Sequence, residues 1–204
     1  MRALTDAIRG FYAVLDADDE ALARALVATA RVLQVRIKPA TGAPGAGALA
    51  AIARMARRVC DEAGAALIVN DRVDVALAVR ADGVHLGQSD LPIAAARRLA
   101  RGLWIGVSTH DVAQVRSARA AGADYLGFGP VFATTTKANP DPVQGVAGLA
   151  AACAAAGDVP VVAIGGMTAA AAAACYAAGA RAICAIGAVN RAPDVVAAGR
   201  AFAR

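Results

Sequence analysis

The feature that most constrains the fold of this chain is a regular alternation of short apolar segments with longer stretches of helical period. Most of the apolar segments are rich in branched residues and lack strict polar–apolar alternation, which is typical of parallel strands buried on both faces. Alternation of such strands with helices indicates a parallel sheet. The predicted strands are Phe11–Leu15, Val32–Ile37, Ala66–Val69, Gly83–Leu86, Trp104–Val107, Tyr125–Phe128, Val161–Ile164 and Ala182–Ile186.

The segments between these strands are rich in Ala, Leu and Arg at helical spacing. Helices are expected over Asp19–Ala30, Leu49–Glu62, Leu91–Arg101 and Val112–Ala121. Several helical segments stop at a glycine suited to a helix C-terminus, namely Gly64, Gly102, Gly122, Gly157 and Gly179. Eight repeats in 204 residues predict an α/β protein with a single (β/α)₈ TIM-barrel domain over residues 1–204. An open doubly wound sheet is the alternative, but no G-x-G-x-x-G follows the first strand.

Composition argues against membrane and nucleic-acid functions. The longest uncharged stretch, Val159–Ala180, contains Pro160 and Gly165-Gly166, so it is interpreted as a strand, a turn and a helix and not as a membrane span. The net charge is +5, but the arginines are scattered and only 4% of residues are aromatic, so no surface for stacking bases is indicated. Phosphorylated small-molecule substrates account for the positive charge equally well.

The cysteines and the first residues indicate the compartment. Cys60, Cys153, Cys175 and Cys184 lie far apart beside apolar residues, so we expect reduced, buried thiols. The opening MRALTDAIRG holds no apolar signal segment. We therefore expect a cytoplasmic protein with neither nucleic acid nor membrane as a partner, and the sequence leaves a homo-oligomer open.

Polar residues cluster where the predicted strands end, which is where barrel enzymes form their active sites. Gln34, Arg36 and Lys38 alternate at period two, so their side chains share one face. Two cations and an amide directed into a barrel need an anionic or polar partner, and a diphosphate would satisfy both cations. A salt-bridged strand end is the alternative.

Carboxylates follow the next two strands. Asn70 and Asp71 come after one strand and Asp90 after the other, and each would also serve as an ordinary helix N-cap. Because carboxylates at neighbouring strand ends can reach one cation, Asp71 and Asp90 are candidate ligands of Mg²⁺, which usually keeps several waters and binds substrate phosphate. His85 fits a packed, hydrogen-bonded residue and a substrate contact equally well.

The later strand ends supply a second anion site. Ser108 is free to face the site because one of the residues 109–111 must cap the following helix. After Gly129-Pro130, three hydroxyls and a lysine form an anion-binding loop: Thr134, Thr135, Thr136 and Lys137. Backbone N–H groups at Gly165-Gly166 and at Ile186-Gly187 occupy the usual phosphate position of a barrel. No catalytic triad or acid–base pair is evident, so the pattern favours a transferase with a diphosphate leaving group.

With these residues laid out, the sequence resembles the thiamine-phosphate synthase family over nearly its whole length. The resemblance rests on six motifs in the same order: QVRIK (34–38), NDR (70–72), ADGVHLGQSDLP (81–92), IGVSTH (105–110), GADYLGFGPVFATTTK (122–137) and VVAIGGMT (161–168). It implies a (β/α)₈ barrel that joins hydroxymethylpyrimidine diphosphate to hydroxyethylthiazole phosphate with Mg²⁺. In the implied dissociative reaction, diphosphate departs before the thiazole nitrogen attacks.

The resemblance also implies roles for individual residues. The pyrimidine diphosphate would be held by Gln34, Val35, Arg36, Ile37, Lys38, Asn70, Ser108 and Lys137, among which the catalytic residues would be Arg36, Lys38, Ser108 and Lys137. The thiazole phosphate would be held by Thr134, Thr135, Thr136, Gly166, Ile186 and Gly187. Asp71 and Asp90 would bind Mg²⁺, and Tyr12 suits packing against the pyrimidine and core packing equally.

Three departures from the family pattern bear on the site. Ala133 replaces a common proline, Gly187 replaces a common serine, and Pro39–Gly47 is rich in Gly and Pro where the family is more helical. This last segment is a candidate lid. The rival interpretations are a related thiazole tautomerase, a barrel that binds thiamine precursors without catalysis, and a sugar-phosphate epimerase. Retention of the strand-end cations and both aspartates argues against the tautomerase and the non-catalytic barrel. The lack of opposed acid–base carboxylates argues against the epimerase.

Overall fold

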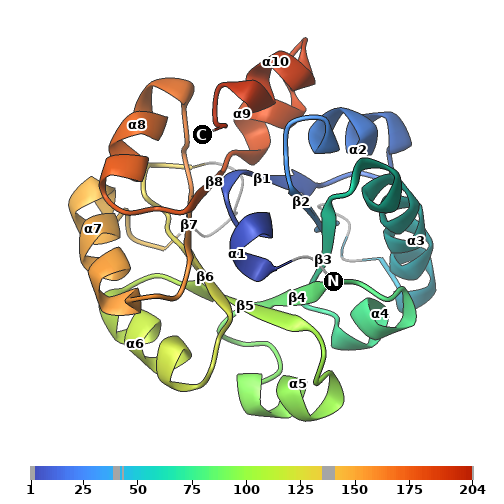
Figure 1. Cartoon of the computed structure of the whole chain (residues 1–204), viewed down its shortest axis with the longest axis horizontal. Helices are drawn as coiled ribbons and strands as arrows, with labels where there is room; N and C mark the ends of the chain where they lie inside the picture. Colours follow the sequence, from blue (N-terminus) through green and yellow to red (C-terminus); the bar gives the residue numbers. More distant parts are fainter. Residues whose placement is uncertain (1–2, 39–41, 43, 135–140, 204) are drawn as a thin grey trace.

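The computed structural model describes residues 3–38, 42, 44–134 and 141–203. Within these residues, eight parallel strands close into a barrel in sequence order, and helices surround it (Figure 1). The predicted TIM barrel is confirmed. The strands are β1 (Gly10–Leu15), β2 (Val32–Val35), β3 (Ala66–Asn70), β4 (Gly83–Leu86), β5 (Trp104–Thr109), β6 (Tyr125–Phe128), β7 (Val161–Ile164) and β8 (Ala182–Cys184).

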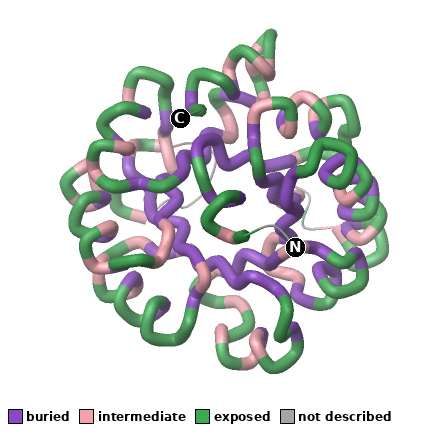
Figure 2. Tube along the Cα trace, in the orientation of Figure 1, coloured by how far each residue is buried: buried purple, intermediate pink, exposed green. Residues whose placement is uncertain are grey.

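Helices follow the strands and cover the outside of the barrel, except α1, which precedes β1 and lies at one end of the barrel (Figure 1). The helices are α1 (Leu4–Ala7), α2 (Glu20–Val27), α3 (Ala46–Ala63), α4 (Val73–Ala78), α5 (Ile93–Leu99), α6 (Val112–Ala120), α7 (Gly145–Ala156), α8 (Ala169–Ala177), α9 (Ile186–Asn190) and α10 (Val195–Arg200). In the burial view, buried residues follow the strands while exposed residues face outward on the helices (Figure 2). No helix in the described ranges is long and apolar enough to cross a membrane.

Some predicted boundaries need correction. Strand β2 ends at Val35 instead of Ile37, although the Arg36 N–H still donates to the Leu15 carbonyl of β1 at 2.9 Å. Strand β8 ends at Cys184, and Ile186 opens a helix instead of closing the strand. The prediction that Gly102 ends a helix is wrong: α5 stops at Leu99, and Ala100 takes the position after it.

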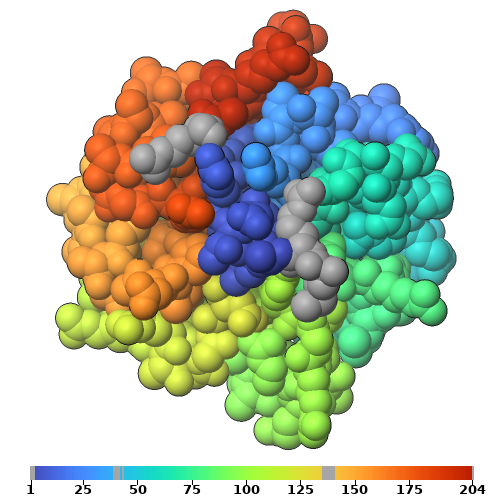
Figure 3. Space-filling model, viewed as in Figure 1, coloured from blue at the N-terminus to red at the C-terminus, as the bar shows by residue number. Residues whose placement is uncertain are grey.

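The strands alternate their side chains between two apolar layers, one inside the barrel and one beneath the helices. The inner layer is closed at the N-terminal end of the barrel by α1, whose neighbour Ile8 is fully buried among strand residues. In the space-filling view, α1 occupies the centre of this face (Figure 3). The opposite, C-terminal end is therefore the one left for a ligand.

Two aspartates tie the N-terminal end of the barrel to its helices. The Asp82 carboxylate accepts from the Leu67 N–H of β3 at 2.8 Å and pairs with Arg57 of α3 at 2.7 Å. Asp124 repeats the arrangement two strands on, accepting from Ile105 of β5 and from Arg97 of α5, both at 2.6 Å. These contacts lie away from the strand ends that carry the candidate site, so their role is stability.

We expect Asp82→Ala to lower the free energy of unfolding by about 2–4 kcal/mol, because Arg57 and the Leu67 N–H would lose a partner. Denaturant unfolding measures the change. Asp61→Ala is the matched control, since Asp61 also pairs with Arg57 but its side chain is 65% exposed. That control is expected to change stability by less than about 1 kcal/mol. Equal effects of the two substitutions would contradict this account of Asp82.

The predicted free thiols are confirmed. All four cysteines are unpaired, and Cys60, Cys175 and Cys184 are buried, whereas Cys153 is half-buried. Burial raises the pKa of the Cys60 and Cys184 thiols to about 12, which keeps both protonated at neutral pH. These thiols are therefore poor nucleophiles and act as small apolar core residues.

Candidate active site

A cavity of about 70 Å³ lies in the C-terminal half of the barrel and is lined by side chains from all eight strands. It brings together five of the predicted site residues, namely Gln34, Arg36, Asn70, Ser108 and Ile186. Tyr12, His85, Tyr125, Gly127 and Cys184 complete much of the remaining wall. Parallel pairing accounts for the convergence, because it sets corresponding residues of neighbouring strands at one level, as with Asn70 and His85.

A chain of hydrogen bonds crosses the barrel at the bottom of this cavity. The Gln34 Nε2 donates to the Tyr12 hydroxyl at 2.9 Å, and the Tyr12 and Tyr125 hydroxyls are 2.9 Å apart. The Tyr125 hydroxyl lies 3.1 Å from His85 Nδ1, and His85 Nε2 lies 2.9 Å from Ser108 Oγ. Two predicted substrate-binding side chains, Gln34 and Ser108, are thus the two ends of one buried network.

Burial sets the protonation states within this network. Burial, helped by the nearby positive charges of Arg36 and Lys38, lowers the pKa of His85 to about 4. Burial also raises the pKa of both the Tyr12 and Tyr125 hydroxyls. At neutral pH the imidazole is therefore uncharged and both phenols keep their protons.

Two glycines make room for the network. A Cβ on Gly106 of β5 would lie 2.1 Å from the Tyr125 ring, and one on Gly127 of β6 would lie 3.1 Å from the His85 ring. Gly106 pairs with both His85 of β4 and Tyr125 of β6, so this glycine lies directly beside the ring that needs the space. Any other residue at position 106 would displace the Tyr125 ring.

The predicted metal ligands meet at the ends of β3 and β4. The Asp71 carboxylate pairs with Lys38 at 2.8 Å and contacts the Asp90 side chain, while Asp90 accepts from the Gly87 N–H at 2.7 Å. Partial burial, and then the neighbouring Asp71, raise the pKa of Asp90. Two carboxylates in contact repel each other when both are charged, and a bound cation would relieve this repulsion.

The alternative in which these residues cap helices is wrong. Arg72 occupies the N-cap position of α4, and its side chain makes no capping hydrogen bond. Asp71 instead adopts a positive φ of 62°, and its N–H donates to the His85 carbonyl at 2.8 Å. Pro92 occupies the N-cap position of α5, so Asp90 does not cap that helix either.

The residues around Asp71 and Asp90 suit Mg²⁺, which keeps water and substrate ligands, better than they suit a metal whose ligands all come from the protein. Among the described residues, no group of three or more His, Cys, Asp or Glu side chains is placed to hold a metal. Mg²⁺ is commonly bound by one or two carboxylates together with waters and substrate phosphates. Asp71 and Asp90 supply such a pair, and Lys38 beside them would compensate a bound phosphate.

Strand β7 ends as predicted, whereas β5 runs to Thr109 and so includes Ser108. Asp111 caps α6 by accepting from the Gln114 N–H at 2.7 Å, which leaves Ser108 directed at the cavity. Thr168 caps α8. Gly166 has a φ of 59°, and a Cβ there would lie 2.2 Å from the Ala133 carbonyl, so the turn packs directly beneath the β6 loop.

Other predicted contacts are placed differently or fall outside the described residues. Gly187 lies inside the first turn of α9 instead of before it. The Val35 side chain is buried beneath the helices and Ile37 packs against the same layer, which leaves only their backbone available to a ligand. Thr134 is half-buried, whereas Thr135, Thr136 and Lys137 lie outside the described residues. The same holds for residues 39–41 and 43 of the candidate lid, whereas Ala46 and Gly47 belong to α3.

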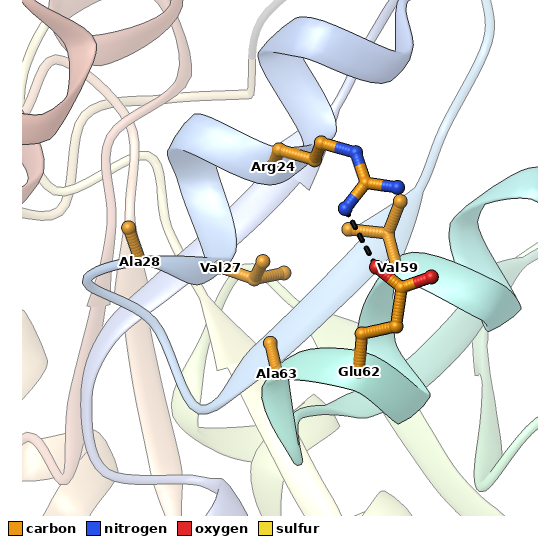
Figure 4. Close-up of a pocket in the computed structure, with 6 residues that line it drawn as sticks. All are labelled: Arg24, Val27, Ala28, Val59, Glu62 and Ala63. Carbon is orange, nitrogen blue, oxygen red and sulfur yellow. Dashed lines mark hydrogen bonds and ion pairs between the residues drawn. The ribbon is translucent and has the colours of Figure 1, made fainter.

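A second hollow, of about 290 Å³, lies on the outside of the barrel between α2 and α3 (Figure 4). Its polar wall is the Arg24–Glu62 ion pair at 2.6 Å, and the other lining side chains are small or apolar. Because Ala28 and Ala63 lead into the starts of β2 and β3, this hollow lies at the N-terminal end of the barrel. It is remote from the predicted site residues.

A closed β/α barrel with cations, paired carboxylates and a polar cavity at its strand ends belongs to the class of barrel enzymes that act on phosphorylated small molecules. The comparisons with known proteins narrow this class. The sequence profile of the thiamine monophosphate synthase family matches residues 11–189. The chain therefore belongs to the thiamine monophosphate synthase family, as its motifs predict, and is an enzyme of thiamine biosynthesis.

Individual relatives agree with this placement. The chain is 47% identical to a thiamine-phosphate synthase of Methanospirillum hungatei over 85% of its own length and 82% of the relative's. It is also 47% identical to one of Chloroflexus aurantiacus, over 86% and 79% of the two chains. A thiamine phosphate pyrophosphorylase from Pyrococcus furiosus superposes with a TM-score of 0.86 at 36% identity, covering 98% of this chain and 96% of the other.

In the sequence analysis, no site role falls to Tyr125, a polar residue of the cavity wall. The sequence pattern places Tyr125 only in a buried strand, yet its hydroxyl joins β1 to β4. A signal was present in the sequence, because a phenol that points into a barrel needs a polar partner. The identity of that partner depends on which strands lie opposite, and this is a property of the closed barrel.

Proposed function

We propose that this enzyme condenses 4-amino-2-methyl-5-(diphosphooxymethyl)pyrimidine with 4-methyl-5-(2-phosphooxyethyl)thiazole, giving thiamine phosphate and diphosphate. The observation that carries the proposal is the cluster of Lys38, Asp71 and Asp90 beside a cavity that Arg36 lines. Such a cluster suits a diphosphate accompanied by a divalent cation. The cavity supplies polar side chains, Gln34 and Asn70, for a heteroaromatic ring next to it.

The proposed mechanism is dissociative and Mg²⁺-dependent. Asp71 and Asp90 would hold the cation, whose positive charge would help to neutralise the departing diphosphate. Arg36 and Lys38 stabilise the charge that collects on the leaving group as its bond to the methylene carbon breaks. The thiazole nitrogen then forms the new C–N bond to that carbon. Described residues supply charge and alignment, and no proton needs to be transferred at the reacting carbon.

The direct product test mixes the enzyme with both substrates and Mg²⁺ and identifies thiamine phosphate by mass spectrometry. Formation of thiamine phosphate supports the synthase. Rearranged thiazole phosphate without condensation would instead support the tautomerase. Binding of both substrates without any product would support a non-catalytic barrel.

We expect Arg36→Met to raise the KM for the pyrimidine diphosphate about 10–100-fold and to lower kcat, because a charge-assisted hydrogen bond to the diphosphate is lost. Steady-state kinetics at saturating thiazole phosphate measure the change. Arg58→Met makes the same chemical change on the outside of α3, where the Arg58 side chain is 64% exposed. Equal kinetics for the two variants would contradict the role given to Arg36.

A further inference from the structure

The buried chain from Gln34 to Ser108 has a direction, because each hydroxyl has one hydrogen to donate. The Gln34 amide nitrogen points at the Tyr12 hydroxyl, so the Tyr12 oxygen accepts from Gln34. Tyr12 then donates its own hydrogen to Tyr125, the only other hydrogen-bond partner that the described residues give it. Tyr125, having accepted from Tyr12, donates to His85 Nδ1.

This order leaves one tautomer for His85. An imidazole that accepts at Nδ1 carries its hydrogen on Nε2 when it is neutral. The Nε2–H then donates to Ser108 Oγ at 2.9 Å. The Ser108 Oγ therefore accepts a hydrogen bond from His85, and the hydroxyl hydrogen of Ser108 is left to point into the cavity.

The opposite tautomer does not satisfy the same contacts. With the hydrogen on Nδ1, His85 would donate to Tyr125, and Tyr125 would donate to Tyr12. The Tyr12 oxygen would then accept from both Gln34 and Tyr125, and its own buried hydrogen would have no partner among the described residues. Buried polar hydrogens without a partner are rare in folded proteins. Only a reversed Gln34 amide would reconcile that tautomer with the network.

We infer that Tyr12, Tyr125 and His85 are positioning residues that hold the Ser108 hydroxyl as a hydrogen-bond donor to the substrate. The Ser108 backbone is fixed from the other side, where its carbonyl accepts from Gln88 at 2.6 Å. The inference rests on the proposed function only for the identity of the acceptor, an oxygen of the diphosphate. The direction of the network is a property of the free enzyme.

The tautomer is measured by long-range ¹H–¹⁵N correlation on enzyme labelled with ¹⁵N-histidine, without substrate. The chain has two histidines, so His110→Gln assigns the His85 signals. The expected result is a protonated Nε2 and an unprotonated Nδ1 on His85 at neutral pH. A protonated Nδ1 would overturn the inference, whatever the outcome of the activity assays.

A second variant tests the coupling across the barrel. Gln34→Glu replaces the donor at the far end with an acceptor, so the whole chain should reverse and move the His85 hydrogen to Nδ1. In a Tyr12→Phe background the connection is broken, and Gln34→Glu should leave the tautomer unchanged. The inference would be overturned if Gln34→Glu left the His85 tautomer unchanged. It would also be overturned if Gln34→Glu changed the tautomer equally with Tyr12 present and in the Tyr12→Phe background.

Kinetics then link the network to catalysis. Tyr125→Phe removes only the hydroxyl, and it is expected to lower kcat about 10-fold while leaving each KM within about twofold. A purely structural role would lower thermal stability without this selective loss of kcat. Full activity of Tyr125→Phe would overturn the positioning role even with the tautomer as expected.

Discussion

Replacing Asp71 with asparagine is expected to lower kcat about 10²–10⁴-fold, because the substitution keeps the size of the side chain but removes one of the two charges available to the cation. Lys38 would also lose its 2.8 Å partner. The measurement is the initial rate of thiamine phosphate formation across a Mg²⁺ titration. The concentration of Mg²⁺ needed for half-maximal rate should rise.

Asp74→Asn is the matched control for Asp71. Asp74 lies three residues further along, in the first turn of α4, where its side chain is 62% exposed and pairs with Arg72. This control should retain activity within about twofold, since an exposed ion pair contributes little. A normal rate and an unchanged Mg²⁺ requirement in Asp71→Asn would remove the metal assignment.

A second large effect is expected from Gly106→Ala. The added Cβ would lie 2.1 Å from Cζ of Tyr125 and 2.5 Å from its hydroxyl oxygen, and the Tyr125 ring is fully buried. The strand or the ring must shift, so the free energy of unfolding should fall by about 3 kcal/mol. Activity should also fall, because the displaced hydroxyl would leave His85. Chemical denaturation and initial rates measure the two effects.

Gly102→Ala controls for the loss of a glycine. No heavy atom of the described residues lies within 4 Å of a Cβ at this position, so stability should stay within about 1 kcal/mol of the parent. A double-mutant cycle adds the specific test. In a Tyr125→Leu background, Gly106→Ala should destabilise less, because the ring it would strike is gone. An equal loss in both backgrounds would show that the clash with Tyr125 is not the cause.

Much of the fold was predictable because parallel strands buried on both faces leave a strong local signal. Runs such as Val161–Ile164 are apolar throughout, and their number and alternation with helices specify a barrel. The boundary errors have a common origin. Helix α9 has five residues, too few for a helical period to show, so Ile186 was assigned to the strand before it. Periodicity likewise placed the end of α5 too late, at Arg101 instead of Leu99.

The candidate site was predictable to the extent that it depends on strand ends. Arg36, Asn70 and Ser108 follow from the rule that barrel sites form where strands end, and they line one cavity. The choice between capping and metal binding for Asp71 was not predictable. It depends on the positive φ of Asp71 and on the approach of Lys38 from the neighbouring strand end, and neither is encoded within the NDR motif. The partners of Tyr125 also depend on closure of the barrel.

The most direct test of the proposed function is an assay of diphosphate release, run with both substrates and Mg²⁺, then without the thiazole phosphate, and then with EDTA. The proposed synthase should release diphosphate only in the complete mixture, with one thiamine phosphate formed for each diphosphate. Release without the thiazole, or release that EDTA does not affect, would contradict the proposed function. Absence of release together with tight binding of thiazole phosphate would also contradict it, and Gly187 would be the first residue to restore to serine.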